Sequence, residues 1–208
     1  MSTLGSPRRQ RGVRTRRRDL AGSILDAAEG LLERRGLDEL TVADVIEAAG
    51  VSRGSFYFYF ESKQTVVAAL LERIVDEVHE ASLPWFERGD TPPERALREA
   101  VTGSLALWRR HAAVLRSTVE TWQSDPELRD LWGDVLRRFT VAAAAQIERD
   151  REAGLAVDGP PARSLAAALV AMNERCFYLA LVDLQPESDE ELVESLTAIW
   201  LSAIYGTD

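Results

Sequence analysis

The sequence predicts an all-α protein with about nine helices. Apolar residues recur at spacings of three and four along most of the chain, which is the period of an amphipathic helix. No segment shows the sustained alternation of apolar and polar residues that is typical of a strand. Short stretches rich in glycine, proline and aspartate separate the helical segments at 89–93, 124–126, 154–161 and 185–186. Hydrophobic residues make up 46% of the chain, which is enough for a packed core.

The chain begins with a basic segment. Residues 1–18 contain seven arginines and no acid, although the net charge of the whole chain is −9, so the remainder carries −16. A basic arm on an acidic body is expected when one end of a protein meets a polyanion, and a solubilising tail explains the composition equally well. The segment has no apolar periodicity and is predicted to be disordered. Apolar spacing then predicts a first helix from Leu20 to the glycine at position 36.

Capping residues mark the next three helices. Thr41, with an acid three residues after it, predicts the N-cap of a short second helix that ends at Gly50. Ser52 is expected to cap a third helix of about six residues. Ser62 is expected to cap a fourth helix, whose apolar stripe runs as far as Pro84.

The last two helices are predicted over about 162–184 and 188–205, and both carry apolar residues on more than one face. In the final helix, Leu192, Leu196 and Ile199 lie on one stripe, and further apolar residues broaden it. A helix with so wide an apolar surface is buried on two sides. We therefore expect the two helices to pair with the same helices of a second copy, in a four-helix homodimer interface.

Residues 41–60, TVADVIEAAGVSRGSFYFYF, have the organisation of a helix-turn-helix, with a short helix, a glycine turn and a second short helix. The aromatic run FYFYF can be read as core packing. Five consecutive aromatic residues on a helix cannot all face inward, however, so at least two are expected to be exposed. The residues left for a surface on the second helix are Ser52, Arg53, Gly54, Ser55, Tyr57 and Tyr59.

This surface has the chemistry of a DNA contact. Gly54 allows the backbone to approach a phosphate, the hydroxyl groups can donate to phosphate oxygens, and Arg53 can reach a base edge. Lys63 stands at the start of the next helix, where the ammonium and the helix terminus together suit a phosphate.

The segment AGVSRGSFYFYFESKQTVV resembles the signature of the TetR family of transcriptional regulators, in its Gly-Val-Ser turn, its aromatic-Tyr pair and its Ser-Lys pair. The resemblance implies a three-helix DNA-binding domain, here 19–64 behind the basic arm 1–18, and a C-terminal domain for ligand binding and dimerisation, here 65–208. It also implies which residues face DNA: Thr41, Ser52, Arg53, Ser55, Tyr57, Tyr59 and Lys63. Gly54 stands where many relatives carry proline, which loosens the start of the helix slightly.

The C-terminal part contains all five tryptophans, which either pack tightly or surround a cavity. Tight packing is the commoner outcome. Asn173 shifts the balance, because it lies between apolar turns of a predicted helix and a buried amide needs a partner. That partner can be a backbone group, a water molecule or a ligand. Its neighbours Glu174 and Arg175 are interpreted as a solvated or intrahelical pair.

A second resemblance concerns the same region. The pattern of MNER, a Gln-Pro break and IWLSAIYG is similar to the C-terminal end of a ligand-sensing branch of the TetR family. It implies a mostly apolar chamber for a small hydrophobic effector, with Asn173 as its polar group. The candidate ligand-binding residues are Trp108, Trp132, Phe139, Met172, Asn173, Phe177 and Trp200.

Other classes of protein find little support. The sequence has no Ser/His/Asp set, no metal-ligand spacing and no phosphate-binding glycine loop, so we expect no enzyme activity, no cofactor and no metal. It has no apolar run long enough for a membrane helix and no signal peptide, which predicts a cytoplasmic protein with no membrane partner. The lone Cys176 cannot form a disulfide within the chain.

The prediction is therefore a DNA-binding transcriptional regulator. By the usual mode of the family it is a repressor that binds a near-palindromic operator in double-stranded DNA as a homodimer and is released by a small apolar ligand. The alternatives are a ligand-carrying helical protein without an operator and a protein-interaction module. Neither alternative needs the cluster of Arg53, Tyr57 and Lys63.

Overall fold

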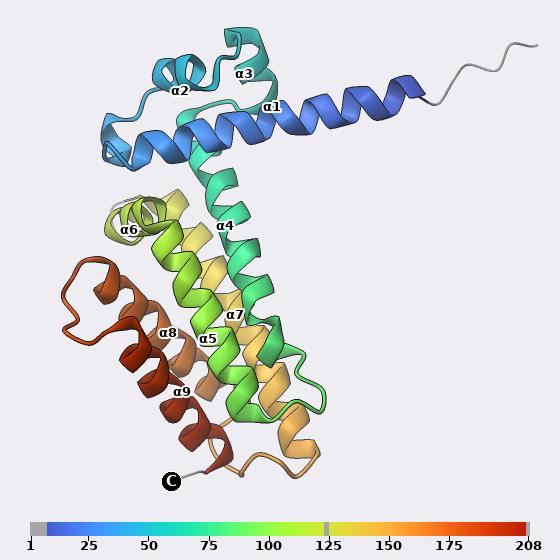
Figure 1. The fold of residues 1–208 in the computed structure, drawn as a ribbon, viewed down its shortest axis with the longest axis vertical. Helices are drawn as coiled ribbons and strands as arrows, with labels where there is room; N and C mark the ends of the chain where they lie inside the picture. Colours follow the sequence, from blue (N-terminus) through green and yellow to red (C-terminus); the bar gives the residue numbers. More distant parts are fainter. Residues whose placement is uncertain (1–7, 123–124, 207–208) are drawn as a thin grey trace, which may run out of the picture. The chain divides into compact units, whose positions relative to one another are not determined.

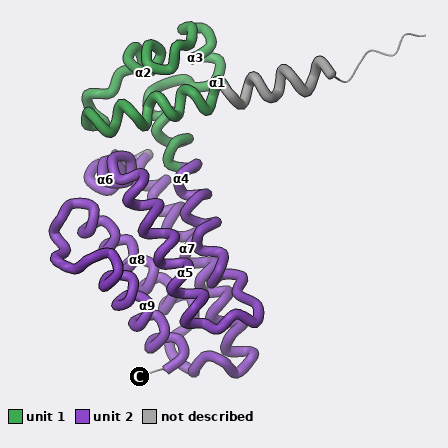
Figure 2. The backbone as a smooth tube through the Cα atoms, viewed as in Figure 1, with its two compact units in different colours: residues 1–71 green, residues 72–208 purple. Residues whose placement is uncertain are grey.

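The computed structural model describes the backbone of residues 8–122 and 125–206, and the side chains of these residues other than 8–19 and 127. Within this part of the chain there are nine α-helices and a 3₁₀ turn, and no strand. The all-α prediction is confirmed. The chain divides into two compact units, residues 1–71 and 72–208 (Figure 2).

The first unit is built from three helices and the start of a fourth (Figure 1). In order they are α1 (Arg8–Leu32), the 3₁₀ turn η1 (Leu37–Glu39), α2 (Val42–Ala49), α3 (Arg53–Tyr59) and the first turns of α4 (Lys63–Phe86). Ile24, Val45 and Phe56 have no exposed surface, so α1, α2 and α3 each contribute a fully buried side chain to the core of this unit.

Local capping explains why the short helices form at all. Thr41 and Asp44 make a capping box at the start of α2, in which the Thr41 hydroxyl accepts from the Asp44 N–H at 3.2 Å. Gly50 ends the helix with φ of 63°, a left-handed conformation that glycine adopts without a steric penalty. The Ser52 hydroxyl accepts from the Ser55 N–H at 3.0 Å and so caps α3. These predicted caps are confirmed.

The basic segment differs from the sequence prediction. Residues 1–7 lie outside the described part, but α1 begins at Arg8, so the backbone of 8–18 is helical rather than disordered. Arginine is a good helix former. The apolar spacing that starts at Leu20 therefore marks where the helix meets its core and not where the helix begins.

The second unit contains the rest of α4 and five further helices. These are α5 (Pro93–Arg110), α6 (Ala112–Thr121), α7 (Pro126–Glu152), α8 (Ala162–Leu181) and α9 (Asp189–Tyr205). Helix α7 packs on α8, and α5 packs on α9. The break between α5 and α6 at His111 was not predicted, because no glycine or proline marks it. There the His111 Nε2 lies 3.3 Å from the Glu77 carboxylate of α4.

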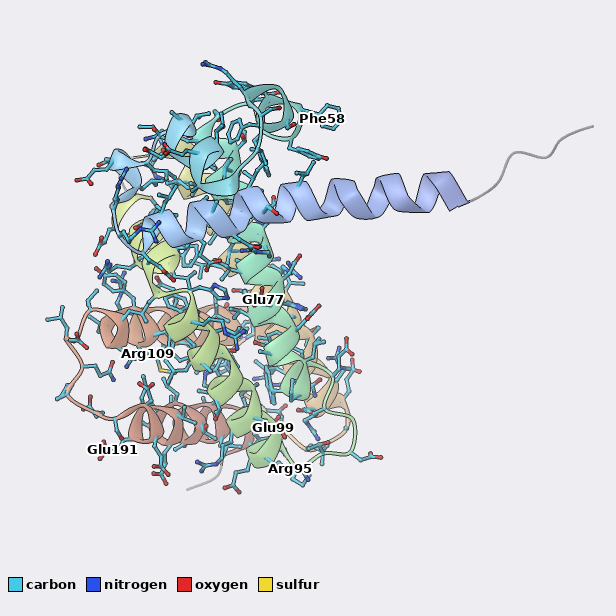
Figure 3. All side chains as sticks on the ribbon, turned by 45° about the horizontal axis from the view of Figure 1, so that its top comes forward. Phe58, Glu77, Arg95, Glu99, Arg109 and Glu191 are labelled. Atoms are coloured by element: carbon cyan, nitrogen blue, oxygen red, sulfur yellow. The ribbon has the colours of Figure 1, made fainter. Side chains whose placement is uncertain are left out.

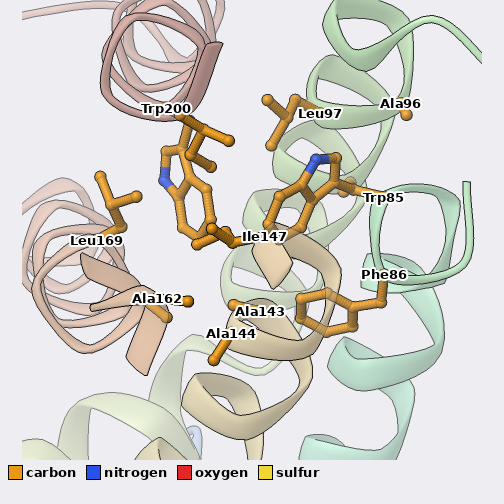
Figure 4. Packing of buried hydrophobic residues seen from close by; sticks show 13 residues of the cluster. Trp85, Phe86, Ala96, Leu97, Ala143, Ala144, Ile147, Ala162, Leu169 and Trp200 are labelled. Carbon is orange, nitrogen blue, oxygen red and sulfur yellow. The ribbon is translucent and has the colours of Figure 1, made fainter. Parts of the chain in front are cut away.

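Helices α4 and α5 approach each other closely. A Cβ atom added at Gly103 would lie 3.2 Å from the Cβ of Ala81, which is tighter than most packing contacts. Glycine at this position of α5 therefore lets the two backbones come together. Figure 4 shows part of the resulting core, in which Trp85 from α4 and Trp200 from α9 meet edge to face with ring centroids 5.0 Å apart.

A buried ion pair connects the end of α4 with α7. Arg88, just after α4, and Asp150 of α7 are 7% and 3% exposed, and the guanidinium donates to both carboxylate oxygens, at 3.2 and 2.5 Å. Tyr205 at the end of α9 donates to the same carboxylate at 2.6 Å, and Gln146 donates at 3.0 Å. The Trp85 indole donates in turn to the Tyr205 hydroxyl at 3.3 Å.

This network determines the ionisation of its members. Burial alone would raise the pKa of Asp150, but hydrogen bonds from Arg88, Tyr205 and Gln146 outweigh burial and hold that pKa below its ordinary value. Burial, followed by the hydrogen bond to Asp150, raises the pKa of Tyr205 to about 12. The carboxylate is therefore ionised and the phenol neutral over the physiological pH range.

Helix α8 has an open surface. It is the one described helix that is long and apolar enough to cross a membrane, with a mean hydropathy of 1.2, and 22% of that stretch is buried within the chain. A single helix of this kind is a weak indication of a membrane span, because helices of soluble proteins meet the same criterion.

Replacement of Asp150 by alanine should lower the free energy of unfolding by about 3–5 kcal/mol, because it leaves the Arg88 charge buried without its partner. Urea denaturation measures the effect. The double variant Arg88→Met, Asp150→Leu removes both charges and should be more stable than Asp150→Ala. A double variant that is less stable than the single one would contradict this account.

Alkaline pH should remove the contribution of Tyr205 to the stability of the fold. Because its pKa is raised above the ordinary value of 10.0, the stabilisation is fully present below pH 10 and is lost as the pH rises through about 12. Thermal unfolding between pH 9 and 12 should therefore show a steeper loss of stability in the natural protein than in Tyr205→Phe. Parallel curves would show that folding does not raise the pKa of Tyr205.

Candidate functional site

The first candidate site is the exposed side of α3. Phe56 and Phe60, four residues apart, are buried against the core of the first unit, whereas Tyr57 and Phe58 are 46% and 63% exposed. The prediction that at least two of the five aromatic residues are exposed is confirmed. Phe58, whose side chain lies on the outer surface of α3 (Figure 3), was not singled out from the sequence, and Tyr59 is only half-exposed.

Arg53 stands at the first position of α3 and is exposed. Its guanidinium carbon lies 5.6 Å from the centre of the Tyr57 ring, one helical turn further along. A cation over an aromatic face is attracted by the ring quadrupole, which limits the directions in which the arginine points. The pair therefore presents a partly oriented guanidinium at the start of the helix.

The hydroxyl groups of this surface already make hydrogen bonds at the N-termini of α2 and α3. Thr41 is exposed and donates to Asp44, and the Ser52 and Ser55 hydroxyls lie 2.8 Å apart. Each hydroxyl oxygen keeps acceptor capacity, and an exposed cap can exchange its bonds for a phosphate. At Gly54 an added Cβ would meet only the Ser52 hydroxyl, at 4.0 Å, so local space does not require glycine there.

Lys63 has a structural role that the sequence did not reveal. Its ammonium donates to the carbonyl oxygens of Leu37 and Asp38 in η1, both at 3.3 Å. It thus ties the start of α4 to the turn before α2. Since an ammonium has three N–H groups, one remains for a further acceptor.

The second candidate site is an apolar cavity of about 100 Å³ within the second unit. Helices α4, α5, α6, α7, α8 and α9 all contribute to its wall. The wall is dominated by large aromatic side chains, with a few polar groups among them. Its aromatic members are Trp85, Phe86, Trp108, Trp132, Phe139, Phe177 and Trp200.

The structure brings six of the seven predicted ligand-binding residues to this wall. They are Trp108, Trp132, Phe139, Asn173, Phe177 and Trp200. Met172 does not line the cavity and packs instead against the neighbouring hydrophobic core. One residue along a helix turns the side chain by about 100°, and the step from Asn173 back to Met172 points the methionine toward that core. Met172 therefore does not join the other six predicted residues at the wall.

Asn173 has a partner within the chain. Its Oδ1 accepts a hydrogen bond of 3.0 Å from the indole N–H of Trp200, an arrangement that the sequence analysis did not consider. The amide N–H groups of Asn173 are not used in this bond and are left for another acceptor. The bond also fixes Trp200, which meets Trp85 on its other side.

The position of Glu174 differs from the solvated or intrahelical pair with Arg175 that the sequence indicated. It lines the cavity and is only partly exposed. Its Oε1 is buried and has no hydrogen-bond partner within the described residues. Burial raises the pKa of this carboxyl group, and the charge of Arg175 opposes the shift only in part. The residues three and four positions before and after Glu174 on the helix are apolar, and this spacing is the signal that could have placed it on a buried face.

Two serines form a further polar spot in the wall. Ser82 of α4 donates to the Val78 carbonyl at 2.9 Å, and its hydroxyl lies 3.1 Å from that of Ser104 on α5. Both serines are buried. They satisfy each other and mark the place where α4 and α5 meet beside the cavity.

Comparison with known families matches the two units separately. Residues 24–70 match the bacterial regulatory proteins of the tetR family, and residues 97–206 match the C-terminal domain of the transcriptional regulator EthR. The first match includes α2 and α3, and the second includes most of α5 and all of α6 to α9.

Individual relatives cover nearly the whole chain. The HTH-type transcriptional regulator EthR of Mycolicibacterium smegmatis is 36% identical over 207 residues, which is 99% of this chain and 95% of that protein. EthR of Mycobacterium tuberculosis is 35% identical over 99% of this chain and 96% of its own length. The crystal structure of a TetR-family transcriptional regulator from Syntrophomonas wolfei has a TM-score of 0.76 at 17% identity, and covers 89% of this chain and 94% of its own.

Proposed function

Because the chain belongs to the TetR family of bacterial transcriptional regulators, with a C-terminal domain of the EthR type, we propose that it binds an operator through α3 and leaves it when a small apolar effector fills the cavity. Membership of the family makes the chain a DNA-binding regulator and not an enzyme. The observation that carries the proposal for the DNA contact is the exposed group of Arg53, Tyr57 and Phe58 on one short helix.

Some residues of the proposed DNA contact would recognise bases, and others would bind phosphates and position the helix. We assign Arg53 to a base edge in the major groove, and Phe58 to an apolar contact such as a thymine methyl group. Thr41, Ser52 and Ser55 would accept or donate at phosphates, together with Tyr57 and Tyr59. Gly54 would leave the backbone open to a phosphate, and the remaining N–H of Lys63 would add a charged contact. The basic arm would add phosphate contacts that are independent of sequence.

The effector site would be the aromatic cavity. Its wall offers a large apolar surface with the Asn173 amide as a hydrogen-bonding group, which suits a small hydrophobic molecule. Helix α4 supplies Ile74, Val75 and Val78 to the wall, and the same helix begins with Lys63 in the first unit. A ligand that moves α4 would therefore change the position of the DNA-binding helices. A coupling of about 1–3 kcal/mol would weaken DNA binding about 5–150-fold.

The assembly would be a homodimer formed by α8 and α9. Of the apolar stripe on α9, Leu192 and Leu196 are buried within the chain, whereas Ile199 is 46% exposed. The small residues Ala171 on α8 and Ala198 on α9 are also exposed. A two-fold dimer would present two α3 helices about 34–36 Å apart to successive major grooves of a near-palindromic operator. Such a protein would act as a repressor in the cytoplasm.

The alternative of a ligand carrier without an operator is less well supported. The cavity alone fits a carrier as well as a regulator. A carrier, however, has no use for an exposed arginine stacked on a tyrosine beside an exposed phenylalanine.

The proposed DNA contact is tested by mobility-shift titration on the DNA that flanks the gene, with excess nonspecific competitor. The natural protein should form a discrete complex. Arg53→Ala should weaken it by about 1–3 kcal/mol, roughly 5–150-fold, because a base contact is lost. Arg98→Ala, which removes an exposed arginine of the second unit, is the matched control and should bind normally. Equal effects of the two variants, or no complex on a genome-wide DNA pool, would refute the proposal.

The proposed dimer is tested by sedimentation. Ile199→Glu should convert the dimer to a monomer, because two charges would face each other across an apolar interface. Val141→Glu changes an apolar residue of α7 that is 53% exposed, and this matched control should leave the dimer intact. A natural protein that is monomeric, or an Ile199→Glu variant that remains dimeric, would contradict the interface.

A further inference from the structure

Glu174 is an acid in the wall of a mostly apolar cavity, and the function proposed above does not use it. It lies on α8 beside Asn173, and its Oε1 is buried without a hydrogen-bond partner in the described residues. A buried carboxylate oxygen without a partner is costly, because it has lost its hydration without gaining a hydrogen bond.

The neighbouring groups compensate the charge of this acid only in part. Arg175, the nearest residue along the chain with an opposite charge, is exposed, and its guanidinium lies 5.2 Å from the centre of the Tyr178 ring. The two serines of the wall bond to each other, and the Asn173 oxygen accepts from Trp200. Among the polar groups of the wall, the Glu174 carboxylate is thus the one without an internal partner for a buried oxygen.

We propose that the effector of this cavity is an apolar amine whose ammonium group donates to Glu174 and whose apolar part lies among the aromatic side chains. The inference rests on the proposed role of the cavity as the effector site. An ammonium is preferred to a hydroxyl because a hydrogen bond between two charged groups is about twice as strong as one between neutral groups. The aromatic wall also favours a cation, since Trp108 and Phe177 lie next to each other, with ring centroids 5.6 Å apart.

Matched probes test the inference directly. Octylamine and octan-1-ol have the same alkyl chain, and at pH 7 the first carries an ammonium where the second carries a hydroxyl. Their binding can be followed by tryptophan fluorescence, because four of the five tryptophans, Trp85, Trp108, Trp132 and Trp200, line the cavity. At 0.15 M salt the natural protein should bind octylamine at least tenfold more tightly than octan-1-ol.

The variant Glu174→Gln keeps the size of the side chain and removes the charge, so it should lose most of the preference for octylamine. Glu99→Gln removes an exposed carboxylate of α5 (Figure 3) and changes the net charge of the protein by the same amount. This control should keep the preference for the amine, which separates a local contact from general attraction to an acidic protein. Thermal unfolding of both variants checks that they are folded.

Three results would overturn the inference. Equal binding of the two probes by the natural protein, or tighter binding of the alcohol, would show that the acid does not select a cation. An undiminished preference in a folded Glu174→Gln variant would place the selectivity elsewhere. If neither probe binds, the proposal that the cavity is an effector site fails. If both bind with equal affinity, that proposal stands, and only the proposal that the effector is an amine fails.

Discussion

The arrangement of the second unit depends on one buried ion pair. Arg88 and Asp150 join the end of α4 to α7, and Tyr205 brings the end of α9 to the same carboxylate. A buried pair of this kind is not a large source of stability by itself, but removal of either partner leaves an uncompensated charge. The pair therefore fixes which ends of three helices meet, and it does so at one end of the cavity, through Trp85.

The cavity follows from this constraint. Trp85 is held by Tyr205 and meets Trp200, and Trp200 donates in turn to Asn173. Neither tryptophan can turn into the open space without breaking a hydrogen bond. Since protein interiors normally pack to high density, a cavity persists only where its wall is held in this way. The same wall includes Glu174, so the features that keep the cavity open also place the acid on which the proposed selectivity for an amine rests.

The sequence predicted those features that depend on local chemistry. Thr41 and Ser52 were identified as caps because an oxygen side chain ahead of a helical pattern satisfies free N–H groups, whatever the rest of the chain does. Features that depend on tertiary packing were not predicted. The break at His111 has no glycine or proline, Lys63 bonds to carbonyls more than twenty residues away, and the direction of Glu174 is decided by the helices around it. Five of the cavity residues are large aromatic side chains, which are usually buried, and the family resemblance implied that they surround a ligand together with Asn173. Met172 packs on the core beside the cavity.

The central claim is that occupancy of the cavity and binding of DNA are opposed equilibria of one molecule. The most direct test is a thermodynamic cycle, in which the affinity for the tighter-binding of the two eight-carbon probes is measured by titration of the free protein and of its operator complex. Linkage requires that DNA weaken probe binding by the same factor by which the probe weakens DNA binding, and we expect a factor of about 5–150. An affinity for the probe that is the same with and without operator would contradict the account.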